Sequence, residues 1–150
     1  MLCKIVCVSS RYGFFDIYAN QINDNDIAGT INIGYLIPKN ENNAAIRTTN
    51  DMPVVEPESL SSFNLVPFQI NPHYLDANPA GHAGETREDR IKEFIQVNRD
   101  IWVVGLREGT MLLIEKESIQ LIGKRNARIF RYGNDAAELS PDDNLNFLLQ

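Results

Sequence analysis

Apolar and polar residues follow one another along the chain in patterns that predict several strands and one clear helix. Short runs of β-branched and other apolar residues, bounded by turn residues, are typical of strands. On this pattern we predict longer strands at residues 3–9, 30–37, 64–70 and 101–106, and shorter ones at 110–116, 118–122 and 127–131. Residues 14–27 are ambiguous and favour a weak helix. The polar segment 134–150 supports no assignment.

The helix signal begins at Thr86. The spacing Thr86-x-x-Asp89 predicts a variant capping box, in which the two side chains satisfy backbone N–H groups of the first turn. Ile91, Phe94 and Ile95 follow at helical spacing and should form the buried stripe. A helix between apolar strands indicates an α/β sheet with parallel pairing. The three short strands that follow predict an antiparallel meander at its edge.

Composition limits the classes of protein to which the chain can belong. A length of 150 residues predicts one domain, covering residues 1–150. The formal net charge of −6 argues against a nucleic-acid or membrane surface, and a small basic cluster is expected to lie at an exposed strand edge. Its members are Lys124, Arg125, Arg128 and Arg131. No apolar run approaches the roughly 20 residues that span a bilayer.

The first residues suggest neither a signal peptide nor a metal site. Cys3 and Cys7 lie four residues apart, so both thiols should point to the same side of a strand. A disulfide or a metal pair stays open, and two packed thiols are the favoured interpretation. We therefore predict a cytoplasmic protein without cofactor or metal.

Three segments concentrate polar residues in loops beside predicted strands: RTTNDMP at 47–53, QINPHYL at 69–75 and AGHAGETREDR at 80–90. Ligand sites of α/β proteins gather at such strand ends. Taken singly, these residues also have structural interpretations. Asp51 can close an Asx-turn, His73 can bond to backbone, and Arg87 can form a surface ion pair with Glu88 or Asp89. His82, between small residues, is interpreted as ordering its loop.

Four stretches together resemble the peptidase E family, also called dipeptidase E or α-aspartyl dipeptidase. They are TTNDMPVV, LVPFQINPHY, GHAGETREDRIKEF and GLREGTML, and the resemblance runs over about residues 46–131. It implies a serine hydrolase that cleaves dipeptides with an N-terminal aspartate. It also implies an incomplete doubly wound, mostly parallel sheet of the class I glutamine-amidotransferase type, with an antiparallel edge.

The resemblance implies roles for three residues. The family's acid corresponds to Asp51, its catalytic histidine to His73 and its substrate-binding arginine to Arg87. A histidine in a loop after a strand can act as the base toward a serine hydroxyl, and a carboxylate can fix its tautomer. The planar fork of arginine suits a substrate carboxylate.

The nucleophile position departs from the family pattern. Counted back from Asp51 without gaps, the expected glycine-flanked serine turn falls on residues 34–40, where Leu36 replaces the serine and Pro38 the second glycine. Leucine has no nucleophilic atom, and proline fixes φ. We expect residues 1–45 to be degenerate and the upstream βα units of the family, with their glycine-rich loop, to be missing. The chain should then be inactive or nearly so.

Two alternatives stay open. The chain can be a non-catalytic protein that binds aspartyl peptides, or a remnant, and a cyanophycinase-like hydrolase is a further candidate. The expected partner is a small Asp-X dipeptide, with no nucleic acid and no membrane. The resemblance implies a monomer, although an exposed sheet edge would allow a dimer to pair.

Overall fold

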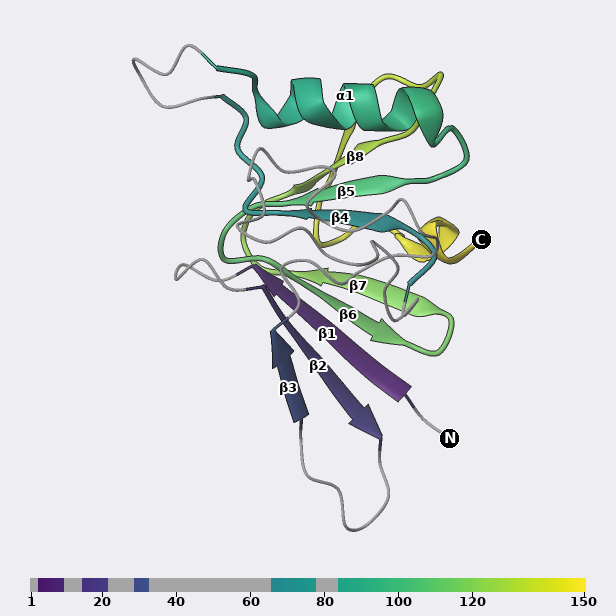
Figure 1. Cartoon of the computed structure of the whole chain (residues 1–150). Helices are drawn as coiled ribbons and strands as arrows, with labels where there is room; N and C mark the ends of the chain where they lie inside the picture. The colour runs from purple at the N-terminus through teal and green to yellow at the C-terminus, as the bar shows by residue number, and fades with distance from the viewer. Residues whose placement is uncertain (1–2, 10–14, 22–28, 33–65, 78–83) are drawn as a thin grey trace, which may run out of the picture.

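The computed structural model describes the backbone of residues 3–9, 15–21, 29–32, 66–77 and 84–150, with side chains in the last two ranges. Within these ranges the protein is a mixed α/β structure with two sheets and one α-helix (Figure 1). One sheet has the strand order β3-β2-β1-β6-β7 and the other β4-β5-β8-β9. The helix α1 lies along the second sheet.

The first sheet is antiparallel throughout its described strands. Its strands are β1 (Cys3–Ser9), β2 (Phe15–Gln21), β3 (Gly29–Asn32), β6 (Met111–Glu115) and β7 (Ser118–Ile122). The predicted strand at 3–9 is confirmed. The weak helix predicted over 14–27 is wrong for residues 15–21, because Phe15, Ile17 and Ala19 alternate with polar residues at the period of a strand paired with β1. The predicted strand at 30–37 is described only up to Asn32.

The second sheet contains the one parallel pair among the described strands. It is formed by β4 (Gln69–Pro72) and β5 (Val103–Leu106), and β8 (Ala127–Phe130) and β9 (Ala137–Leu139) extend it in antiparallel fashion. β4 begins later than the predicted strand at 64–70 and continues two residues beyond it, to Pro72. Proline is compatible with the last position of a strand that has a described neighbour on one side only.

The predicted meander is wrong at its third strand. β6 and β7 form a hairpin, but β8 pairs with β5 in the other sheet. Gly123 has a φ of +137°, and a Cβ there would lie 2.7 Å from the carbonyl oxygen of Gly109. Only glycine therefore fits the turn at which the chain leaves β7 for the second sheet.

Helix α1 (Arg87–Val97) is built as the sequence predicts. Thr86 is its N-cap, and the capping box with Asp89 is present on both sides. The buried stripe is confirmed, and it packs against Tyr74, Val103 and Phe130. Because Tyr74 follows β4 directly, this packing joins the end of β4 to the helix.

The larger apolar core lies between the two sheets. It combines inward side chains of β4, β5 and β8 with those of β6 and β7. The 3₁₀-helix η2 (Asn146–Leu149) closes it, and Leu145 and Leu148 are fully buried. Trp102 and Phe147 make an edge-to-face contact at its border, with ring centroids 5.1 Å apart. The C-terminal segment, for which the sequence allowed no assignment, is thus part of the core.

Candidate active site

His73 follows the last residue of β4, at the carboxyl end of the parallel pair. Its φ is +53°, in the left-handed region that few residues other than glycine adopt. The backbone is held there from both sides: Pro72 pairs with Leu106, and the N–H of Tyr74 donates to the carbonyl oxygen of Leu106 at 2.9 Å. Such backbone strain is concentrated at functional sites and persists only when neighbouring contacts impose it.

A carboxylate lies beside the His73 ring. The His73 Nδ1 atom is 4.0 Å from Oε1 of Glu108, with side chains that are 21% and 46% exposed. Glu108 belongs to the turn after β5, so the two residues come from the carboxyl ends of neighbouring parallel strands. A carboxylate next to Nδ1 favours the tautomer that leaves Nε2 as the proton acceptor. At 4.0 Å this contact is longer than a hydrogen bond, and contacts between catalytic groups often tighten only when substrate binds.

Arg87 is the first residue of α1. It is partly buried, and the helix N-terminus adds positive potential to its surroundings. The next residue, Glu88, accepts a hydrogen bond from the Tyr74 hydroxyl at 3.2 Å. Since Tyr74 follows His73, this bond joins the segment of the histidine to that of the arginine.

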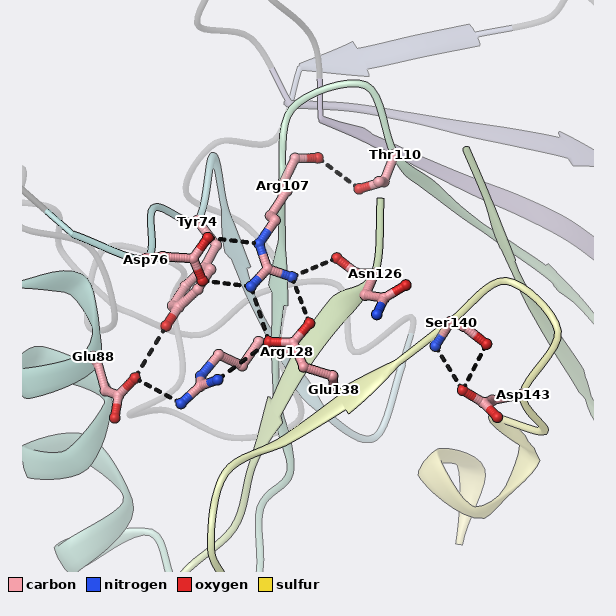
Figure 2. A network of polar contacts seen from close by, with 10 residues as sticks. All are labelled: Tyr74, Asp76, Glu88, Arg107, Thr110, Asn126, Arg128, Glu138, Ser140 and Asp143. Carbon is pink, nitrogen blue, oxygen red and sulfur yellow. Dashed lines mark hydrogen bonds and ion pairs between the residues drawn. The ribbon is translucent and has the colours of Figure 1, made fainter. Parts of the chain in front are cut away.

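A network of charged side chains supports both segments (Figure 2). Arg107 binds Asp76 and Glu138, and Arg128 binds Glu138 and Glu88, both at 3.2 Å. Lys92 also pairs with Glu88, at 2.8 Å. The basic cluster predicted to lie at an exposed strand edge is thus divided: Lys124 and Arg125 are exposed, Arg128 belongs to this network, and Arg131 lies over the Trp102 ring.

These contacts shift the ionisation of their members. Hydrogen bonds from Arg107 hold the pKa of Asp76 and of Glu138 below their usual values, and a hydrogen bond from Lys92 does the same for Glu88. Burial raises the pKa of the Tyr74 phenol well above its ordinary value, and the nearby Glu88 carboxylate adds to that effect. The carboxylates are therefore charged and the phenol neutral at pH 7.

Two of the three predicted site residues lie in the described part of the chain. His73 is at a strand end as expected, and Arg87 opens the predicted helix. Asp51, Leu36 and His82 lie outside the described residues, so their roles stay predictions. The sequence interpretation missed Glu108, although GLREG was part of the resemblance. Its position directly after a strand parallel to β4 was the signal that could have identified it.

The described ranges hold no group of three or more His, Cys, Asp or Glu residues able to bind a metal ion. Backbone pairing places Cys3 and Cys7 on one face of β1, opposite Gln21 and Ile17. No helix in the described ranges is long and apolar enough to cross a membrane.

A histidine beside a carboxylate at a strand end is an arrangement found in hydrolases, in which the carboxylate orients a histidine base. The comparison with family models agrees with this class. The chain belongs to peptidase family S51, whose model matches residues 41–122, more than half of the sequence.

Curated relatives carry corresponding names. The chain is 52% identical over 122 residues to Peptidase E of Nostoc sp., covering 81% of this chain and 50% of that protein. It is 53% identical over 106 residues to Peptidase E of Streptomyces coelicolor (70% and 43% covered). It is 48% identical over 107 residues to the probable alpha-aspartyl dipeptidase of Drosophila melanogaster (71% and 44% covered). The chain thus spans about half the length of these relatives.

Proposed function

We propose that this chain is a homologue of the serine-type dipeptidases that hydrolyse dipeptides with an N-terminal aspartate, and that Leu36 leaves it without turnover in this form. The observation that carries the proposal is the His73–Glu108 pair at the joined ends of β4 and β5. The names of the relatives support the substrate class. The strands β4 and β5 are parallel, and α1 connects them along the chain. This arrangement supports the proposal of an incomplete doubly wound sheet.

In this proposal each residue has a distinct role. His73 is the general base, which takes a proton at Nε2 from a nucleophile and returns it to the leaving amine. Arg87 binds the carboxylate of the substrate's aspartyl side chain. Leucine at position 36 offers no atom that could attack the scissile carbonyl carbon. Loss of a nucleophilic serine from such a site typically costs a factor on the order of a million in kcat.

The acid that orients His73 has two candidates. The family resemblance assigns the role to Asp51, and the geometry supports Glu108, whose carboxylate lies 4.0 Å from Nδ1. We favour Glu108 because the pairing of β4 with β5 brings both residues to the same edge. Asp51 remains a candidate on the sequence resemblance.

The first experiment measures turnover. Purified chain is incubated with Asp-Leu and with Ala-Leu, and released leucine is quantified by mass spectrometry beside a His73→Ala variant. We expect no release above the level of the variant. Hydrolysis of Asp-Leu by the unmodified chain that disappears in His73→Ala would show that another group replaces the serine, and the assignment of inactivity to Leu36 would be wrong.

A second candidate function is binding without catalysis. It is favoured by the intact capping box, which keeps Arg87 on an ordered helix start whatever residue occupies position 36. Calorimetry with Asp-Leu separates a binding protein from an inactive homologue that does not bind. Binding at millimolar concentration or tighter that is lost in Arg87→Ala, and kept in Arg99→Ala beyond the other helix end, supports a binding protein. Absence of heat exchange with the unmodified chain contradicts it.

A further inference from the structure

The guanidinium of Arg107 uses every hydrogen-bond donor it has. Nε and Nη2 donate to the two carboxylate oxygens of Asp76, the former at 3.1 Å. Nη1 and Nη2 donate to the two oxygens of Glu138 at 2.8 and 2.9 Å, and Nη1 also donates to the carbonyl oxygen of Asn126 at 2.7 Å. Arginine carries five N–H donors in a rigid fork, so this group is saturated. The side chain is only 12% exposed.

One arm of Arg107 holds the segment that carries His73. Asp76 follows His73 by three residues, and both of its oxygens bind Arg107. The left-handed backbone at His73 needs such external support, because few residues adopt it without cost. The ring of Tyr74, between them, lies under the same guanidinium, with Cζ of Arg107 5.4 Å from the ring centroid.

The backbone of Arg107 holds the turn that carries Glu108. Its carbonyl oxygen accepts hydrogen bonds from the Thr110 hydroxyl at 2.6 Å and from the Thr110 N–H at 3.2 Å. Thr110 is buried, and these bonds close the turn around Glu108 and Gly109 (Figure 2 shows the hydroxyl bond). Arg107 thus contacts the segment that carries His73 through its side chain, and the turn that carries Glu108 through its backbone.

We propose that Arg107 is a positioning residue, whose fork to Asp76 sets the orientation of the His73 ring toward Glu108. The inference rests on the proposed role of His73 as the base. Arg107 contacts no reacting atom in this scheme, and its side chain acts on His73 through Asp76. Its bonds to Glu138 and Asn126 use the other N–H donors of the guanidinium and do not contact the segment that carries His73.

A merely structural role predicts a different result from a positioning role. If the network only stabilises the fold, removing Glu138 should disturb the site as much as removing Asp76. If Arg107 positions His73, Asp76→Asn and Arg107→Lys should disturb the imidazole and Glu138→Gln should not. Lysine keeps the charge but cannot bind a carboxylate through two parallel N–H bonds.

The test is the imidazole tautomer in the full chain. Long-range ¹H–¹⁵N correlation spectra at pH 7.5 report the Nδ1 and Nε2 resonances of His73 and His82, which a His82→Gln variant assigns. Urea unfolding of each variant confirms that it is folded. We expect the two His73 nitrogen resonances to shift toward a mixture of tautomers in Asp76→Asn and Arg107→Lys. They should stay unchanged in Glu138→Gln and in Arg99→Lys, a matched surface arginine.

The outcomes separate the positioning role of Arg107 from the proposed function. Unchanged His73 resonances in folded Asp76→Asn, or equal shifts in Asp76→Asn and Glu138→Gln, would overturn the positioning role. Neither result depends on turnover or dipeptide binding. Conversely, the expected shifts together with no dipeptide binding would leave Arg107 as a positioning residue and remove the support for an aspartyl-peptide site.

Discussion

Replacing Gly105 with alanine would place a methyl carbon against the ring that follows His73. A Cβ at this position in β5 would lie 2.8 Å from both Cδ2 and Cγ of Tyr74 and 3.2 Å from its Cβ. The ring cannot easily yield, because it is buried against Phe130 with centroids 5.8 Å apart and shares a cluster with Ile91. A glycine within a strand often marks such a close approach of another group.

The size of the effect follows from these contacts. Overpacking a well-packed core costs typically about 1–3 kcal/mol. If the ring moves, the hydrogen bond from its hydroxyl to Glu88 at 3.2 Å is weakened too, which adds about 1 kcal/mol. We therefore expect Gly105→Ala to lower the free energy of unfolding by about 2–4 kcal/mol.

Urea unfolding followed by circular dichroism measures this cost. The control is a double-mutant cycle with Tyr74→Ala, which removes the ring. The alanine at position 105 should cost much less in the Tyr74→Ala background than in the original chain. An equal cost in both backgrounds, or a change within about 0.5 kcal/mol in the original chain, would refute the close contact as the cause.

Three further predictions use the same unfolding measurement. Thr86→Ala removes the capping box of α1 and should cost about 1 kcal/mol. Leu148→Ala opens a cavity at a fully buried position of η2 and should cost about 2–5 kcal/mol; a neutral result would mean that the C-terminal segment does not pack in the core. The lowered pKa values of Asp76 and Glu138 predict stability that is complete above their ordinary values of 3.8 and 4.5 and is lost as the pH falls through the lower folded-state values. An Arg107→Lys variant should lose less stability than the unmodified chain over this acidic range. An equal loss would contradict the assignment of this pH dependence to the hydrogen bonds from Arg107.

Local signals in the sequence were sufficient for the helix and for most strands. Thr86 and Asp89 stand three residues apart, and the stripe of Ile91, Phe94 and Ile95 repeats at helical spacing, so neighbouring residues alone determine this element. The loop position of His73 was also predictable, since the predicted strand ends at residue 70, shortly before it.

Features that depend on pairing between distant segments were not predictable. β8 joins the other sheet instead of extending the β6–β7 hairpin, because its inward residues, Ala127 and Ile129, fill the core beside β5. Similarly, residues 15–21 form a strand because β1 is available as a partner, although the segment alone is ambiguous.

The proximity of His73 to Glu108 has the same origin. The two residues are separated by a helix and a strand, and only the parallel register, with Pro72 opposite Leu106, brings them to one edge. The partners of Arg107 lie 31 residues away on either side, at Asp76 and Glu138. No local sequence pattern indicates these contacts between distant residues, because they follow from the register of the sheet.

The most direct test of the central claim compares the His73 nitrogen resonances in the unmodified chain with those in Glu108→Gln. The account predicts that the Nδ1 resonance shifts in this variant, because the carboxylate beside that atom is lost, and that it stays unchanged in Glu117→Gln, an exposed control in the β6–β7 turn. Identical His73 resonances in the folded Glu108→Gln protein and in the unmodified chain would contradict the pair on which the proposed function depends.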